Sequence, residues 1–139
     1  MIIADTGFWV ALADDADQHH KLAISKLEYL KEPLITTWPV LTEVCHLLLK
    51  RRGIDAELGF IRSYHQGAFL VFDLNESHND KLLKLMEKYS DLPMDLADAS
   101  LVILAEELGN GQILSTDQRD FQTYRWKNTY PFHNILLEQ

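Results

Sequence analysis

The segment LPMDLADASLVILAEELGNGQILSTDQRDF, residues 92–121, decides the fold of this chain. Within it, residues 96–108 are mostly apolar and predict a buried helix, which ends at the stop Gly109-Asn110-Gly111. Residues 112–116 predict a short strand, and Asp117 stands where that strand ends. A helix that leads through a tight stop into a strand indicates a chain that alternates the two kinds of element.

The same alternation continues on the N-terminal side of this segment. Strands are expected at residues 1–4, 33–37 and 69–73, and an edge strand is expected in the tail at 132–137. Helices are expected at residues 8–13, 18–31, 40–52, 54–66 and 75–89. We therefore predict an α/β fold with three layers, α/β/α, around a central, mostly parallel sheet of four to five strands, in one domain over residues 1–139.

The composition indicates a folded protein whose charge balance is unusual for a protein that binds nucleic acids. Its 139 residues are 47 % apolar, which is enough for a hydrophobic core without disulfide or metal cross-links. Lys and Arg number 13 against 21 Asp and Glu, so the net charge is −8. That balance argues against a general nucleic-acid coat protein, which needs a basic surface. It does not exclude an enzyme that reaches phosphate groups through metal ions, because the ion supplies the local positive charge.

The sequence also bears on the compartment. Cys45 is the one cysteine, so an internal disulfide is excluded, and a reducing compartment is expected. No apolar run approaches the roughly 20 residues that cross a bilayer, and no basic segment of a signal peptide precedes the first strand. We therefore expect a cytoplasmic protein without membrane contact.

Acidic residues stand where a parallel sheet gathers its ligands. Asp5 ends the first strand and Asp117 ends the strand at 112–116, so both side chains point to the same rim if these strands are neighbours. Asp98 begins a helical face that is otherwise apolar, which is an unusual place for a solvated carboxylate. Glu43 lies about one turn past Pro39, at the border of the core face of its helix.

These four carboxylates predict a cation site. Like charges a few ångströms apart raise one another's pKa or attract a cation. Ligand sets made only of oxygen favour hard ions, so Mg²⁺ or Mn²⁺ is expected. Such ions can activate water and stabilise the charge that develops during phosphodiester cleavage, so no side-chain nucleophile is required.

Four motifs together resemble the PIN domain family, and in particular the VapC-type toxins of bacterial and archaeal toxin–antitoxin pairs. The motifs are Ile3-Ala-Asp-Thr-Gly-Phe-Trp-Val-Ala-Leu12, Leu41-Thr-Glu-Val44, Asp95-Leu-Ala-Asp-Ala-Ser100 and Ile113-Leu-Ser-Thr-Asp-Gln-Arg-Asp-Phe121. No single motif is specific, because an aspartate after a strand is common. The set of four, in the order of the family and along the whole chain, is much more specific.

The resemblance implies a ribonuclease that depends on Mg²⁺ or Mn²⁺ and a toxin of a type II toxin–antitoxin pair. It implies that the metal ligands and catalytic residues are Asp5, Glu43, Asp98 and Asp117. Supporting and substrate-binding roles are implied for Thr6, Thr116, Lys50 and Arg119, with the threonine hydroxyls near the ligating carboxylates or the water that the metal holds. The implied partners are an RNA substrate, a cognate antitoxin protein and a second copy of this chain in a homodimer, for which the helices between Phe8 and Tyr64 are the expected surface.

Each acidic residue also has a structural interpretation. Asp95 and Asp98 have the spacing of a helix N-cap and its third-position partner, and we assign Asp95 to the cap while leaving open whether it joins the site. Asp117 would fit an ordinary turn, and Glu43 would fit a surface pair with Lys50. Asp120 is assigned to a helix or turn and is left out of the site. Phe8, Trp9, Trp38 and the leucines are assigned to the core.

Other classes of function are less well supported by the sequence. There is no glycine-rich phosphate loop, no dinucleotide motif and no Gly-x-Ser-x-Gly elbow. A phospho-acceptor receiver domain could use Asp73, but the lysine that should follow a late strand is missing. Two alternatives within the PIN fold stay open, namely an RNA-processing nuclease without an antitoxin and a catalytically silent binding module. The RNA target and the number of metal ions stay open as well.

Overall fold

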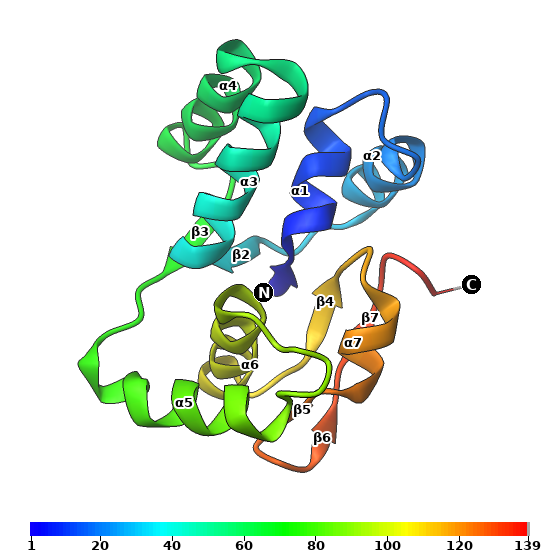
Figure 1. Ribbon diagram of the computed structural model, residues 1–139. Helices are drawn as coiled ribbons and strands as arrows, with labels where there is room; N and C mark the ends of the chain where they lie inside the picture. The colour runs from blue at the N-terminus through cyan, green and yellow to red at the C-terminus, as the bar shows by residue number, and fades with distance from the viewer. Residues whose placement is uncertain (139) are drawn as a thin grey trace.

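The computed structural model describes residues 1–138 and shows a three-layer α/β architecture (Figure 1). The strands are β1 (Ile2–Ala4), β2 (Leu34–Thr37), β3 (Leu70–Phe72), β4 (Gln112–Leu114), β5 (Arg125–Trp126), β6 (Tyr130–Pro131) and β7 (His133–Asn134). The helices are α1 (Thr6–Ala13), α2 (His20–Tyr29), α3 (Trp38–Arg52), α4 (Ile54–His65), the 3-10 turn η1 (Glu76–His78), α5 (Asn79–Lys88), α6 (Leu96–Leu108) and α7 (Gln118–Thr123).

Five strands form the central sheet, in the order β3-β2-β1-β4-β7. Every neighbouring pair in it is parallel, so the predicted mostly parallel sheet of four to five strands is confirmed. The edge strand expected in the tail is present as β7, which pairs with β4. β5 and β6 form a separate antiparallel hairpin that the sequence analysis did not predict.

Helices cover both faces of this sheet. In Figure 1, α1 to α4 lie above the sheet, whereas α5 and α6 lie below it. Each layer is held together by its own helix contacts, since α3 packs on α1 and α4, and α5 packs on α6. The order of the strands reverses at β1, because β2 and β4 lie on its two sides, and ligands of parallel sheets bind at such a point.

β1, β4 and α6 lie at the centre of the core and contribute most of its largest fully buried side chains. All three residues of β1 are buried, and eight of the 13 residues of α6 are buried. A helix that is apolar on most of its circumference must lie inside the protein, which is why α6 packs under the sheet. Among the largest side chains that are fully buried, these elements contribute Ile2, Ile3, Leu101, Ile103, Leu104, Ile113 and Leu114.

Several boundaries differ from the expected ones. α2 begins at His20 rather than residue 18, because the Asp17 carboxylate accepts a hydrogen bond from the backbone N–H of His19 and holds a turn there. The helix expected at 75–89 starts as the separate turn η1, which Asn75 caps. No helix was predicted at 118–123, where α7 lies. The assignment of Trp38 to the core was wrong, since 46 % of its surface is exposed.

Within residues 1–138, no helix is both long enough and apolar enough to cross a bilayer.

Candidate metal centre

Asp5 and Asp117 lie at the same rim of the sheet, as expected if their strands are neighbours. β1 and β4 pair directly, with Ile3 opposite Ile113 and Ala4 opposite Leu114. The backbone N–H of Asp5 extends this pairing by donating a hydrogen bond to the carbonyl of Leu114 at 3.0 Å. Both aspartates therefore follow the carboxyl ends of adjacent parallel strands.

The Asp5 carboxylate is buried, with 6 % of the residue exposed. Its Oδ1 accepts a hydrogen bond from the backbone N–H of Thr6 at 2.7 Å, and its Oδ2 accepts one from the hydroxyl of Ser115 at 3.0 Å. Burial raises the pKa of Asp5 to about 7 despite these two donors, and the charges of Glu43 and Asp117 add to the increase. A carboxylate in this position is poorly stabilised until a cation approaches it.

Asp98 faces this rim from the first turn of α6. The side chain of Asp95 caps the helix by accepting the N–H of Asp98 at 2.8 Å, so the predicted N-cap role of Asp95 is confirmed. The hydroxyl of Tyr124 donates to Oδ2 of Asp98 at 2.8 Å. Burial raises the pKa of Asp98 to about 8, and the Asp5 charge is the next cause. The Asp98 carboxylate, at the start of the apolar face of α6, is therefore partly desolvated and repelled by Asp5.

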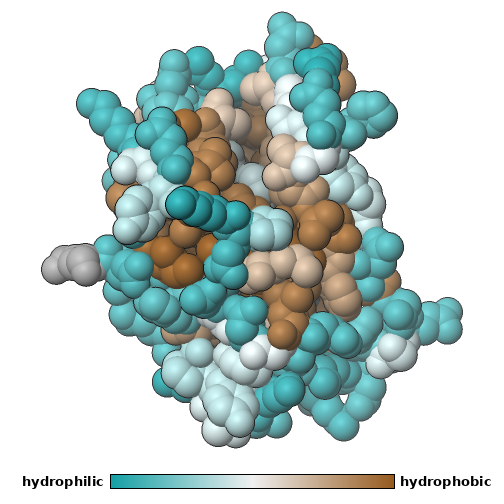
Figure 2. Space-filling model, turned by 180° about the vertical axis from the view of Figure 1, so that it is seen from behind, coloured by the Kyte–Doolittle hydropathy of each residue, from teal (hydrophilic) through white to brown (hydrophobic). Residues whose placement is uncertain are grey.

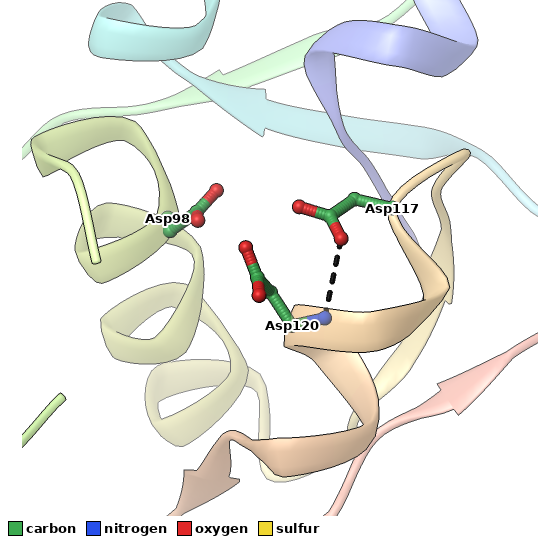
Figure 3. Close-up of side chains that lie close together, drawn as sticks. All are labelled: Asp98, Asp117 and Asp120. Carbon is green, nitrogen blue, oxygen red and sulfur yellow. Dashed lines mark hydrogen bonds between the residues drawn. The ribbon is translucent and has the colours of Figure 1, made fainter. Parts of the chain in front are cut away.

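Asp120 completes a compact acidic cluster with Asp98 and Asp117. Each of the three offers one carboxylate oxygen, and these oxygens lie within 4.8 Å of one another. Figure 3 shows the three side chains converging from α6 and from the start of α7. Asp117 is the N-cap of α7, and its Oδ1 accepts the backbone N–H of Asp120 at 3.2 Å, which fixes the Asp117 carboxylate at the start of α7.

Sequence reasoning left Asp120 out of the site, and the structure brings it in. A usable signal was present, because Asp117 and Asp120 have the same N-cap and third-position spacing as Asp95 and Asp98. That spacing places a second carboxylate one turn beyond the strand end. Burial raises the pKa of Asp117, and a hydrogen bond and repulsion from the neighbouring Asp120 raise it further.

Glu43 is near the cluster but not within it. It is half-buried on α3 and lies outside the group of oxygens that approach within 4.8 Å in the described part of the chain. Its charge nevertheless contributes to the raised pKa of Asp5, so the two carboxylates act on each other across the rim. Glu43 also lines a hollow of about 630 Å³ together with Asp95.

Three hydroxyl side chains lie at the rim in different roles. The Oγ1 of Thr6 is buried and has no hydrogen-bond partner within residues 1–138. Thr116 packs against the backbone of Gly7, so closely that a Cβ on Gly7 would come 1.9 Å from its Oγ1. The hydroxyl that contacts the Asp5 carboxylate belongs instead to Ser115, which the sequence analysis did not single out.

The two basic residues proposed for the substrate lie at the surface. Lys50 is exposed in the last turn of α3, about two turns beyond Glu43. Arg119 lies two residues after Asp117, and its Nε donates to Oδ1 of Asp120 at 2.9 Å while 75 % of its side chain is exposed. Arg119 therefore borders the cluster, whereas Lys50 does not.

The residues present fit a hard divalent cation. The donors at the rim are carboxylate oxygens, which suit Mg²⁺ or Mn²⁺ rather than softer metals. Burial and the repulsion of neighbouring carboxylates raise the pKa values of Asp5, Asp98 and Asp117, so a cation would favour their ionised forms. The buried Oγ1 of Thr6, beside Asp5, has no hydrogen-bond partner in the described part of the chain and is a further polar atom that a ligand could satisfy. Such a set of groups can hold an ion and bring an anionic substrate to it.

Comparison with known proteins points in the same direction. The family model of the PIN domain matches residues 2–127. The curated protein Ribonuclease VapC26 of Mycobacterium tuberculosis (strain ATCC 25618 / H37Rv) is 28 % identical over 124 residues, which cover 89 % of this chain and 92 % of that protein. The crystal structure of M. tuberculosis VapC20, described as a sarcin-ricin loop cleaving toxin, superposes with a TM-score of 0.80 at 19 % identity over 86 % of this chain and 92 % of that one.

Proposed function

The chain belongs to the PIN domain family, and from this premise we propose that it is a metal-dependent endoribonuclease that hydrolyses phosphodiester bonds of RNA. The observation that carries the proposal is the acidic cluster of Asp98, Asp117 and Asp120, next to the buried Asp5 at the switch point of the sheet. The similarity to Ribonuclease VapC26 supports the same class of reaction.

Each residue of the rim has a proposed task. Asp98, Asp117 and Asp120 would hold Mg²⁺ or Mn²⁺, with Asp5 and Glu43 adding negative charge from β1 and α3. The bound ion supplies an activated water and stabilises the charge that develops on the phosphate. Ser115 and the N–H of Thr6 fix both oxygens of Asp5, and Tyr124 fixes one oxygen of Asp98, which leaves the second oxygen of Asp98 free to point into the cluster.

The family resemblance further supports a toxin that a cognate antitoxin blocks. A hollow of about 400 Å³ lies between α1, α2 and α4, and its lining is mostly apolar, with Trp9, Leu12, Leu27 and Phe60 among its residues. Figure 2 shows that apolar side chains gather in the middle of the face that is turned away from the viewer in Figure 1. An amphipathic helix lays its apolar face into grooves of this kind, so we assign this hollow to a helix of the antitoxin.

A homodimer through the helices between Phe8 and Tyr64 also stays a proposal. These helices carry exposed apolar side chains such as Leu49, Leu58 and Ile61, which a second copy of the chain would cover. Light scattering of the purified protein, alone and with the antitoxin, would give the mass of each assembly.

The proposed reaction can be tested with a mixed pool of RNA and the purified chain. We expect cleavage that requires Mg²⁺ or Mn²⁺, stops on addition of EDTA, and is lost in the Asp5→Asn variant, whose side chain is nearly the same size. Absence of cleavage by the wild-type protein, or equal cleavage by wild type and Asp5→Asn, would contradict the proposal. The first outcome would favour a catalytically silent binding module, and the second would reveal a contaminating nuclease.

A further inference from the structure

Trp38 is the exposed tryptophan of this chain. Of the three tryptophans, Trp9 and Trp126 are buried, whereas 46 % of Trp38 is exposed. It is the first residue of α3 and directly follows the carboxyl end of β2, the strand that pairs with β1. A large aromatic side chain is therefore held in solvent at the rim where the acidic residues gather, and burial in the core does not explain its position.

Neighbouring side chains hold the Trp38 ring in place. Its Nε1–H donates a hydrogen bond to Oδ1 of Asp73, which follows β3. The ring of Tyr64 meets the ring of Trp38 edge to face, at 5.8 Å between centroids and 86° between planes. The polar atom of the indole is thus occupied, and the ring cannot rotate freely. What Trp38 still offers to a ligand is the flat surface of a ring with a defined orientation.

The exposed ring lines the same hollow as Glu43. This hollow has a volume of about 630 Å³, and its other walls include Pro39, His46 and Leu96. The hollow borders the acidic cluster through the first turn of α6, because Asp95, which lines it, accepts the backbone N–H of Asp98 at 2.8 Å. A group that lies against Trp38 is therefore close to the position where the phosphate would be cleaved.

We propose that Trp38 is a stacking platform for one nucleobase of the RNA substrate, next to the scissile phosphate. The inference rests on the proposed nuclease function and adds a base-binding position to it. A base fits this place because it presents a flat ring to the indole and a sugar-phosphate chain toward the metal centre. An apolar peptide fits less well, since Glu43 and Asp95 at the edge of the hollow would lose water without gaining a partner.

Stacking on an aromatic ring specifies the class of ligand, a nucleobase, but does not select one base over another. Every base has a π-face, so an aromatic platform binds single-stranded nucleic acid with little preference for sequence. Loss of one such contact weakens binding by roughly 5- to 100-fold in single-strand binding proteins. Trp38 would thus hold an unpaired or flipped-out nucleotide and contribute to substrate affinity rather than to the chemical step.

Tryptophan fluorescence gives a direct test that does not need catalysis. We would titrate the Asp5→Asn protein, in the presence of Mg²⁺, with a single-stranded oligoribonucleotide and with the same backbone lacking bases. Quenching by the first and not by the second is expected, and the Trp38→Phe change in the same background should abolish the response, because Trp9 and Trp126 are buried. If the fluorescence stays unchanged while anisotropy shows that the RNA binds, the inference is overturned and the nuclease function is left intact.

Steady-state cleavage gives the second test. Trp38→Leu should raise KM by about 10-fold or more with a smaller change in kcat, and Trp38→Phe should recover most of the affinity. The control variant Tyr130→Leu, at an exposed aromatic residue of β6, should behave as wild type. Equal KM for Trp38→Leu and wild type would contradict the platform. Two outcomes would assign the Trp38 ring to a protein contact instead. The first is a change in the mass of the Trp38→Leu variant in light scattering, and the second is a failure of iodide to quench Trp38 fluorescence in the free protein. Failure of wild-type RNA cleavage and binding would reject the nuclease function itself.

Discussion

Ser115 donates a hydrogen bond from its hydroxyl to Oδ2 of Asp5 at 3.0 Å, although 110 positions separate the two residues along the chain. The same hydroxyl accepts the backbone N–H of Asp117 at 2.9 Å. One small buried side chain therefore joins the end of β1 to the turn that carries Asp117. This link keeps the carboxylates of the rim together even though burial and mutual repulsion raise their pKa values.

The Asp98→Asn change should leave the metal-free protein as stable as wild type or more stable. The substitution removes a charge that burial and Asp5 disfavour, and the amide oxygen can still accept the Tyr124 hydroxyl. RNA cleavage should be lost, because a carboxylate of the cluster is gone. Thermal unfolding in EDTA checks the first part, with Asp95→Asn as the matched control, since asparagine caps a helix as well as aspartate does. A clear decrease in Tm for Asp98→Asn would show that Asp98 is a structural partner.

The stability of the metal-free protein should fall as the pH rises from about 4 to about 8. Asp5 and Asp98 have pKa values of about 7 and about 8 in the folded chain, against 3.8 as the ordinary value, so the folded state binds more protons than the unfolded state between these limits. The free energy of unfolding then decreases with pH, by roughly 4 kcal/mol for a group shifted as far as Asp5.

Urea unfolding in EDTA at several pH values would measure this dependence. Saturating Mg²⁺ or Mn²⁺ should reduce the loss of stability at high pH, because the ion binds the ionised carboxylates of the folded state. Asp98→Asn should show a shallower dependence than wild type. A stability that stays flat or rises between about pH 4 and 8 without metal would contradict the repulsive site.

Tyr124→Phe should weaken metal binding more than it weakens the fold. Tyr124 is fully buried and packs edge to face against Tyr89 and Phe121, so the phenylalanine ring can fill the same space. Its hydroxyl orients Asp98, and loss of a group that orients a metal ligand typically costs 10-fold or more in affinity. Calorimetric titration with Mn²⁺ is the measurement. Tyr89→Phe, which removes a hydroxyl that does not contact Asp98, is the control, and equal Mn²⁺ affinity of Tyr124→Phe and wild type would refute the positioning role.

Asp120→Asn should reduce metal-dependent cleavage, whereas Arg119→Ala should change catalysis through KM alone. Asp120 is buried in the cluster, but its partner Arg119 is mostly exposed, and ion pairs in water contribute at most about 1 kcal/mol. Mn²⁺ titrations of both variants separate the two roles. If Arg119→Ala lowers the Mn²⁺ affinity as much as Asp120→Asn does, the ion pair rather than the Asp120 carboxylate is what the metal site requires.

Gly7→Ala should destabilise the chain through its contact with Thr116. A Cβ at Gly7 would lie 1.9 Å from Oγ1 of Thr116, so one of the two elements has to shift. A cost of about 1 to 3 kcal/mol in the free energy of unfolding is expected for crowding of this kind. The double variant Gly7→Ala, Thr116→Ala should recover part of it, because the clashing oxygen is removed. Urea unfolding of the two single variants and the double variant tests this, and purely additive effects would argue against the contact.

Much of the fold could be predicted because it depends on local patterns. The apolar circumference of α6 matches residues 96–108, and Gly109, with a positive φ of 71°, ends the helix where the glycine-rich stop was expected. Short apolar runs between helices also predict a parallel sheet, and the predicted rim for Asp5 and Asp117 follows from the direction of parallel strands. Residues 118–123 were missed as a helix, since a helix of two turns carries little periodic signal.

The sequence by itself determined the strands of the central sheet, the helices other than α7, and the end of the sheet at which the acidic residues stand, because side-chain periodicity and strand ends are local properties. Only the tertiary structure decided which groups meet there. Ser115 reaches Asp5, Tyr124 reaches Asp98, and Asp120 joins Asp98 because distant segments pack side by side. The tertiary structure also decided that Trp38 is exposed, since an aromatic residue at the start of a helix is buried only if another element packs over it.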